Sequence, residues 1–234
     1  GVRIFERTPM RELRAGHPAE VVTPGGRVHA GHVVVTTGAW AAADRHWSRA
    51  FAVAVDYMVV TEPISERLAE IGWVTYTGIA DSRAMILYLR RTADDRVAIG
   101  GGGLGPVYGG RIEGRALASQ RLAGVAAGEL LWLFPQLEGV RFDAAWSGPM
   151  DITRAGVPFF FTAPCGNLHA GLGFSGHGLT PTKVGGKTLA SLVLGADDEW
   201  AKLPVVGPPL TRVPPEPLRW PMVQTMSWLM ETGD

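Results

Sequence analysis

Two stretches beyond residue 145 carry the residue types best suited to chemistry. The first is Gly171-Leu-Gly-Phe-Ser-Gly-His-Gly178, which leads directly into Leu-Thr-Pro at 179–181. Its glycines allow sharp turns and let the backbone approach a ligand closely. Thr180 suits an N-cap and Pro181 a first helical residue, so a helix is expected to begin here. The free N–H groups of such a terminus suit an anionic or electron-rich ligand edge.

The second stretch is Trp146-Ser-Gly-Pro-Met-Asp-Ile-Thr153, followed by Gly156-Val-Pro158. The Asp151 carboxylate could pair with a substrate ammonium or only hydrogen-bond the local turn, and the sequence leaves both roles open. In the first stretch, His177 could orient substrate or polarise a cofactor as a neutral imidazole. The favoured alternative is that its backbone N–H is the functional part and the ring packs or meets solvent.

Two further candidates lie on a strand expected at 84–90. Tyr88 and Arg90 alternate there, so their side chains point to the same face of a sheet. Arg90 is explained equally well as a surface charge. The run Gly100-Gly-Gly-Gly-Leu-Gly105 formally fits Gly-x-Gly-x-x-Gly, but Pro106 follows it and no helix opens, which argues against dinucleotide binding there.

Strands and helices must position these residues. Alternating and buried apolar runs predict strands at 2–6, 27–29, 33–37, 50–62, 84–90, 96–100 and 141–146, with turns at 23–26 and 94–95. Helical periodicity predicts helices over 114–133 and, at the end of a proline-rich tail, over 222–230. The helix that begins at Pro181 should end at Gly195, and Phe134-Pro135 should stop the long one.

Composition narrows the class of protein. Lys and Arg number 22 and Asp and Glu 22, so no net charge favours nucleic acid or an anionic membrane. No apolar run approaches the ~20 residues of a membrane span. The single cysteine, Cys165, excludes an internal disulfide framework and a cysteine-based zinc site. We therefore expect a cytoplasmic protein with a small-molecule substrate and no metal.

The residue sequences of these motifs resemble those of one family. Gly-Phe-Ser-Gly-His-Gly, a helix containing Gly185-Gly-Lys187 and an exit at Leu194-Gly195 resemble the flavin-contacting segment of the D-amino-acid oxidase-like FAD-dependent oxidoreductases. Glycine, sarcosine and γ-glutamylputrescine oxidases belong to that superfamily. His32-Val-Val-Val-Thr-Thr-Gly-Ala-Trp40 resembles its second flavin fingerprint, with Thr36 where alanine is usual, and Glu6-Arg7-Thr8-Pro9-Met10 resembles the segment that contacts adenine.

The resemblance implies FAD as the cofactor and assigns residues to it. The helix N-terminus would face the pyrimidine edge of the isoalloxazine. The cofactor-binding residues implied are Met10, Thr37, Gly38, Ala39, Trp40, Gly173, Phe174, Ser175, Gly176, His177, Gly178, Leu179 and Thr180.

The resemblance also implies the chemistry, which is oxidation of the C–N bond of an amine or amino-acid-like substrate by hydride transfer to flavin. Tyr88, Asp151 and His177 are the catalytic candidates, and Tyr88, Arg90, Met150 and Asp151 the substrate candidates. In the amino-acid oxidase branch an arginine clamps the substrate carboxylate at the position of Met150. The absence of that arginine argues against a simple α-amino acid.

The fold class implied is α/β (α+β), with part of a Rossmann-like FAD-binding domain and an antiparallel-sheet substrate domain. Residues 1–45 and 149–203 would form the FAD-binding part, 46–148 the substrate domain, and 204–234 a tail with a short helix. The N-terminal strand and Gly-x-Gly-x-x-Gly turn that hold the FAD pyrophosphate in this family are absent from the start of the sequence. The chain is therefore expected to be the C-terminal part of a longer protein. The alternative is an inactive fragment or subunit that needs an N-terminal complement to supply the FAD pyrophosphate site.

Overall fold

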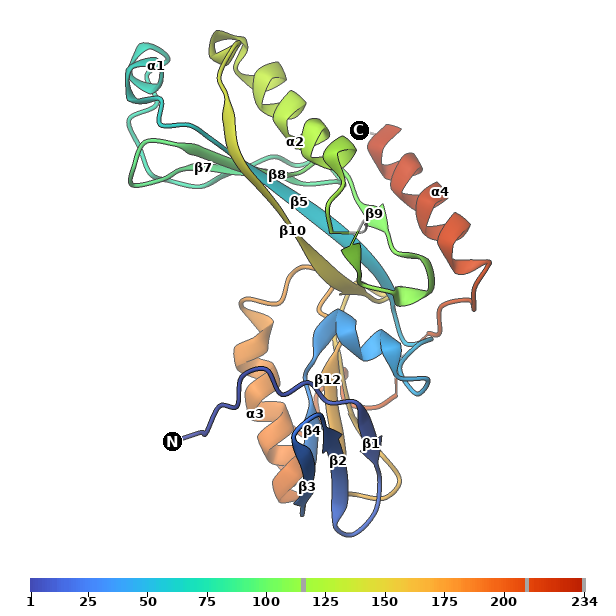
Figure 1. The fold of residues 1–234 in the computed structure, drawn as a ribbon. Helices are drawn as coiled ribbons and strands as arrows, with labels where there is room; N and C mark the ends of the chain where they lie inside the picture. Colours follow the sequence, from blue (N-terminus) through green and yellow to red (C-terminus); the bar gives the residue numbers. More distant parts are fainter. Residues whose placement is uncertain (115–116, 209–210, 233–234) are drawn as a thin grey trace. The chain divides into compact units, whose positions relative to one another are not determined.

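The computed structural model describes residues 1–114, 117–208 and 211–232 (Figure 1). The chain divides into two compact units. The first comprises Gly1–Ala41 with Asp151–Arg212, and the second Ala42–Met150 with Val213–Asp234. Each unit therefore contains segments that are distant in the sequence.

The first unit begins with an antiparallel meander in the order β1 (Glu12–Arg14), β2 (Ala19–Thr23) and β3 (Gly26–Ala30). The turn at 23–26 joins β2 to β3, with Thr23 opposite Gly26. The strand predicted at 2–6 is wrong. Val2 and Ile4 are more than four-fifths exposed there, and no strand of the described chain supplies them with hydrogen bonds.

A second sheet in the first unit joins β4 (Val33–Val35), β11 (Phe159–Thr162) and β12 (Leu168–Leu172) in the order β11-β12-β4. β12 runs parallel to β4 and antiparallel to β11. β4 ends two residues earlier than predicted. Residues 205–207 of the tail extend the sheet beyond β11, since the Phe160 N–H donates to the Val205 carbonyl (2.8 Å) and the Gly207 N–H to the Phe160 carbonyl (2.7 Å).

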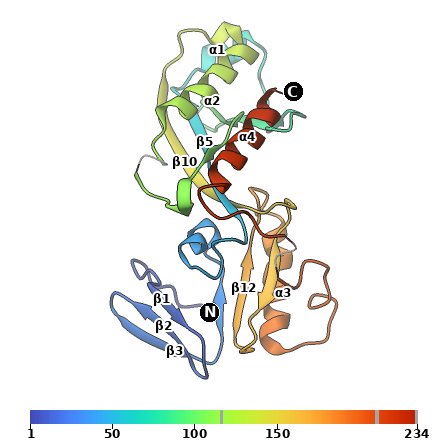
Figure 2. The ribbon, with the colours of Figure 1, turned by 90° about the vertical axis from the view of Figure 1, so that its right-hand side faces the viewer.

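Helix α3 (Pro181–Leu194) packs against β11 and β12 (Figure 2). Glycines on both elements allow the close approach, because a Cβ on Gly185 would lie 2.9 Å from the Phe160 ring and one on Gly171 3.0 Å from Leu189. The predicted start and end are confirmed. Gly195 adopts a left-handed φ of 63°, and its N–H and that of the next residue donate to carbonyls of the last helical turn.

The second unit contains one sheet in the order β10-β5-β8-β7-β6, with β9 paired to β5. Its strands are β5 (Ala52–Thr61), β6 (Ile79–Ala80), β7 (Leu87–Arg91), β8 (Val97–Gly101), β9 (Gly105–Pro106) and β10 (Phe142–Ile152). The β7–β8 hairpin turns at Asp95, where φ is 58°, as the sequence predicts. β10 continues six residues beyond its predicted end.

Helix α2 (Gln120–Leu133) covers one face of this sheet. Ala126 and Leu130 are fully buried against Val59, Leu87 and Ile99. The helix starts six residues later than predicted, because the Ser119 hydroxyl caps it by accepting the Leu122 N–H. It ends at Phe134 before η4 (Pro135–Leu137), as predicted, whereas residues 115–116 lie outside the described chain.

The remaining helical elements are α1 (Ser65–Glu70), the 3-10 turns η1 (Gly38–Ala43) and η2 (Tyr108–Gly110), and α4 (Arg219–Thr232). α4 packs near β9 and η2 and begins three residues before its predicted start. Pro221 does not prevent this, since proline is tolerated in the first helical turn. Within the described ranges no helix has the length and apolar character of a membrane span.

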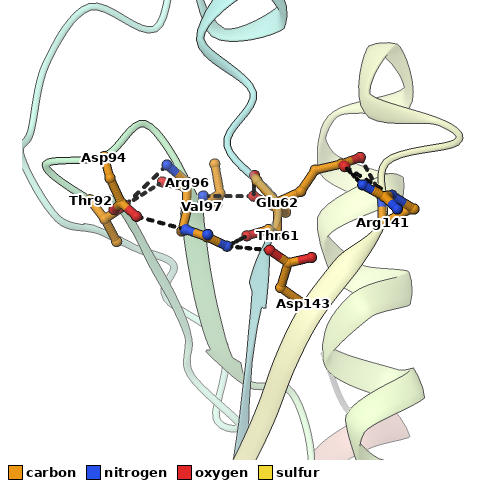
Figure 3. A network of polar contacts seen from close by, with 8 residues as sticks. All are labelled: Thr61, Glu62, Thr92, Asp94, Arg96, Val97, Arg141 and Asp143. Atoms are coloured by element: carbon orange, nitrogen blue, oxygen red, sulfur yellow. Dashed lines mark hydrogen bonds and ion pairs between the residues drawn. The ribbon is translucent and has the colours of Figure 1, made fainter.

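A polar network joins three strands at one end of this sheet (Figure 3). The fully buried Thr61 hydroxyl accepts the Val97 N–H (2.9 Å) and donates to the Glu62 carbonyl (2.7 Å). Arg96 donates to the Thr61 carbonyl (2.9 Å) and to the Asp143 carboxylate (2.6 Å). The network therefore fixes β5, β8 and β10 relative to one another.

Candidate functional site

The loop that follows β12 has a backbone that side chains would obstruct. Gly173, Ser175 and Gly176 adopt left-handed φ values of 83°, 53° and 82°. A Cβ on Gly173 would lie 2.3 Å from Thr153 Cγ2, well inside van der Waals contact. Glycine is therefore required at 173 by both its φ and its surroundings.

Asp151 holds this loop in place from the end of β10. Its carboxylate, in a side chain only 6% exposed, accepts the Gly173 N–H (2.5 Å), and its carbonyl accepts the Ser175 N–H (3.2 Å). The Ser175 hydroxyl in turn accepts the Thr153 N–H (3.2 Å). Burial raises the pKa of Asp151, and the backbone N–H of Gly173 partly opposes that rise. Of the two roles that the sequence left open, the turn hydrogen bond is present.

The N-terminus of α3 leaves three backbone donors unused. Within the described part of the chain, the N–H groups of Gly178, Leu179 and Thr180 donate to no acceptor. Thr180 is the N-cap residue, but its side chain makes no capping hydrogen bond. Leu179 is 94% exposed, so these donors lie at the surface. The His177 N–H is not among them, because it donates to the Phe174 carbonyl (2.9 Å).

The fingerprint segment after β4 lies beside this loop. β4 and β12 are parallel neighbours with Val35 opposite Ala170, so their carboxyl ends open at the same edge. Gly38, with a φ of 54°, turns the chain there into η1. Ala39 is buried and Trp40 is 59% exposed. The carboxyl edge of a parallel sheet is where open α/β folds bind ligands.

The structure thus brings together two groups of predicted cofactor residues: Thr37, Gly38, Ala39 and Trp40 after β4, and Gly173, Phe174, Ser175, Gly176, His177, Gly178, Leu179 and Thr180 after β12. Met10 lies half-buried just before β1. The His177 ring is exposed, and no side-chain partner for it is present in the described residues. The unused donors and the glycine cradle fit the electron-rich edge of a flavin.

The candidates of the second unit lie on its sheet. The Tyr88 hydroxyl, on β7, donates to the Asp56 carboxylate on β5 (2.5 Å). Burial, followed by the hydrogen bond to Asp56, raises the pKa of Tyr88. Arg90 points to the same face and is exposed, and Met150 is half-buried near the end of β10. Asp56 was not among the residues predicted from the sequence, although it is the one charged residue within the apolar run 50–60.

Two other sequence features have structural explanations. His169 is a core histidine. It is fully buried, and its ring nitrogens lie 3.1 Å from His32 Nδ1 and 3.0 Å from the Thr162 hydroxyl. The glycines after β8 permit close packing, since a Cβ on Gly101 would lie 2.0 Å from the Ile86 carbonyl oxygen. Among the described residues, β9 and the 3-10 turn η2 follow them and no α-helix opens before Gln120, which agrees with the argument against dinucleotide binding there.

Comparison of the sequence with known proteins identifies a family and several relatives. The family of FAD dependent oxidoreductases termed DAO matches residues 1–192. Gamma-glutamylputrescine oxidoreductase of Escherichia coli K12 is 31% identical over 209 residues, which are 87% of this chain and 47% of that protein. The probable oxidoreductase OrdL of Haemophilus influenzae is 26% identical over 204 residues, covering 85% of this chain and 44% of that protein. The chain therefore spans about half the length of the curated relatives it matches.

Solved structures agree in fold. Glycine oxidase from Geobacillus kaustophilus has a TM-score of 0.65 and 22% identity, over 83% of this chain and 50% of that one. L-proline dehydrogenase from P. horikoshii has a TM-score of 0.66 and 22% identity, over 86% of this chain and 52% of that one. The predicted mixed helix and sheet fold of these flavoenzymes is confirmed. The chain belongs to the DAO family of FAD dependent oxidoreductases.

Proposed function

We propose that the whole protein is an FAD-dependent oxidoreductase that oxidises the C–N bond of an amine or amino-acid-like substrate. One observation carries this proposal most strongly. The fingerprint turn after β4 and the glycine loop after β12 open at the same sheet edge, and the second leads to unused N–H donors. Residues 1–45 and 149–203 would then serve the cofactor, and 46–148 the substrate.

Each part of the first unit would have a distinct task. Bound FAD would supply the hydride acceptor. The N–H groups of Gly178, Leu179 and Thr180, with the positive end of the α3 dipole, would stabilise negative charge at the ring edge. Asp151 would act as a positioning residue, because its carboxylate fixes the Gly173 N–H and hence the loop. The exposed imidazole of His177 would remain available to orient substrate.

The second unit would bind the substrate through Tyr88, with Arg90 on the same face. No strong general base is required, provided that the reacting amine binds in its neutral form. Met150 stands where the amino-acid oxidase branch places a carboxylate-binding arginine, which favours an amine over a simple α-amino acid. The name of the E. coli relative, an oxidoreductase of γ-glutamylputrescine, supports an amine substrate.

An anaerobic titration of the whole protein with amines tests the proposal. We expect primary or secondary amines to bleach the visible flavin band, whereas matched alcohols leave it unchanged. Hydrogen peroxide released on readmission of air would identify an oxidase, and its absence a dehydrogenase. A folded protein that shows no flavin band would contradict the proposal.

A second candidate is a flavoprotein piece that needs an N-terminal complement. The observation that favours it is that residues 1–45 contain no Gly-x-Gly-x-x-Gly turn, the motif that would hold the FAD pyrophosphate. We expect the 234-residue chain by itself to hold FAD weakly. Equilibrium dialysis measures this directly, and tight stoichiometric binding would contradict it.

A further inference from the structure

The sheet of the second unit has two unlike faces. Val59, Leu87 and Ile99 point toward α2 and are buried in the apolar core. The residues that alternate with them point to the opposite face, which we call the α2-distal face. It carries Asp56, Met58 and Val60 of β5, Tyr88 and Arg90 of β7, and Ala98 and Gly100 of β8. The polar groups of this face, Asp56, Tyr88 and Arg90, therefore lie outside the apolar core.

A glycine lets Tyr88 reach Asp56 across the intervening strand. β8 lies between β5 and β7, and Gly100 is in register with both Met58 and Tyr88. A Cβ on Gly100 would lie 2.8 Å from Tyr88 Cε2 and Cζ and 2.7 Å from Met58 Cγ. The phenol ring thus lies directly over Gly100, and its hydroxyl donates to Asp56 Oδ2 at 2.5 Å.

The Asp56 carboxylate has no cation beside it in the part of the chain that the structure describes. Among the described residues, its other oxygen accepts only the Tyr57 N–H (2.7 Å). The carboxylates of Asp81 and Glu129, by contrast, both pair with Arg83. An ionised carboxylate has about four acceptor positions, so these two donors leave Asp56 with capacity for a cation.

The arginine on the same face is remote from that carboxylate. Arg90 is opposite Ala98, in the cross-strand row of Val60, four residues along β5 from Asp56. Four strand residues span about 13 Å, and Arg90 lies two strands away as well. Screening at physiological ionic strength has a length of about 8 Å, so the charge of Arg90 compensates Asp56 little.

We infer that Asp56 and Tyr88 form a binding site for a charged amine nitrogen, and that Asp56 selects diamines over monoamines. This inference rests on the proposed function. The nitrogen next to the reacting carbon must be neutral for that carbon to lose hydride, whereas a second, distal nitrogen can remain an ammonium ion. Asp56 supplies the opposite charge, and the Tyr88 hydroxyl holds the carboxylate in place while its ring face offers a cation–π contact.

The test compares 1,4-diaminobutane with butylamine on the whole holoprotein. Titration calorimetry with the flavin chemically pre-reduced measures binding alone, because no turnover contributes heat. Asp56→Asn keeps an acceptor for the Tyr88 hydroxyl and removes the charge. We expect it to lower the ratio of diamine to butylamine affinity about 10- to 100-fold, the range of a hydrogen bond to a charged group. Glu70→Gln, at an exposed carboxylate on α1, is the matched control and should leave the ratio unchanged.

An unchanged ratio in Asp56→Asn overturns the inference. If that variant fails to fold or to retain flavin, Tyr88→Phe decides instead: a smaller selective loss of diamine affinity supports the inference, and an unchanged ratio overturns it. The same samples, oxidised and titrated anaerobically, report separately on the proposed function. Bleaching of wild type without Asp56-dependent selectivity would leave the function standing, whereas Asp56-dependent binding without bleaching would leave only the binding site.

Discussion

Substitution of Gly173 by alanine tests whether the loop after β12 is shaped by its packing. Two costs arise at this position. The left-handed φ of 83° disfavours any side chain, and the new Cβ would lie 2.3 Å from Thr153 Cγ2. Gly166 is a matched control in the same unit, because its φ is 78° and a Cβ added there would meet no heavy atom within 4 Å among the described residues.

The two variants separate the costs. A non-glycine residue in the left-handed region costs about 1–2 kcal/mol, and overpacking costs roughly 1–3 kcal/mol more. Alanine also lowers the entropy of the unfolded chain, which offsets about 0.4–1 kcal/mol in both variants. Gly173→Ala should therefore lose about 1–3 kcal/mol more stability than Gly166→Ala.

Urea unfolding of the whole protein at a fixed FAD concentration measures that difference. Thr153→Ser removes Cγ2 and keeps the hydroxyl, which donates to the Val157 carbonyl (2.8 Å). The double variant Gly173→Ala with Thr153→Ser should recover most of the difference, since the contacts that remain, 3.3 and 3.4 Å from the Phe159 ring, are much less tight. Equal losses at 173 and 166, or no recovery in the double variant, would refute the packing argument.

Three further predictions follow from buried polar groups. Asp151→Ala leaves the Gly173 N–H without its acceptor and should weaken FAD binding, measured by flavin fluorescence, more than Asp151→Asn, by roughly 1–3 kcal/mol. Burial, followed by the charge of His32, lowers the pKa of His169 from 6.5, so the unfolded chain takes up this proton at a higher pH than the folded chain does. The free energy of unfolding should therefore be highest above about pH 6.5 and decline as the pH falls, which the midpoints of urea unfolding would show. Thr61→Val removes the acceptor of the Val97 N–H and should cost about 1–3 kcal/mol of unfolding free energy.

Each of these has a control that shares the chemistry but lacks the buried contact. Asp197→Asn, at a residue with an exposed side chain, should leave FAD binding unchanged. His46→Gln, at an exposed ring, should retain the decline below about pH 6.5 that His169→Gln removes. Thr77→Val, at an exposed threonine, should cost little. Equal effects in a variant and its control would contradict the corresponding prediction.

Local signals in the sequence predicted the parts of the fold that local physics decides. Pro181 and Gly195 bound α3 as expected, because the fixed φ of proline and the left-handed freedom of glycine act within one turn. The strands β5, β7 and β8 were also predicted, because the pattern of apolar residues along a strand depends only on neighbouring positions in the sequence. The meander strands β1 and β2 were missed, since they are short and lack a strong apolar alternation. The strand predicted at 2–6 failed because strand propensity requires a hydrogen-bonded neighbour.

The same distinction separates the two halves of the candidate site. The glycine loop and helix terminus were recognisable from contiguous residues, as was the fingerprint turn. Asp56 was not, because its significance depends on two strand registers that place Met58, Gly100 and Tyr88 in one row. Gly100 itself belongs to a run that imitates a nucleotide-binding motif, yet here the missing side chain makes room for a tyrosine ring. A glycine cluster therefore indicates close approach, and only the strand pairing reveals whether a ligand or the protein's own side chain fills the space.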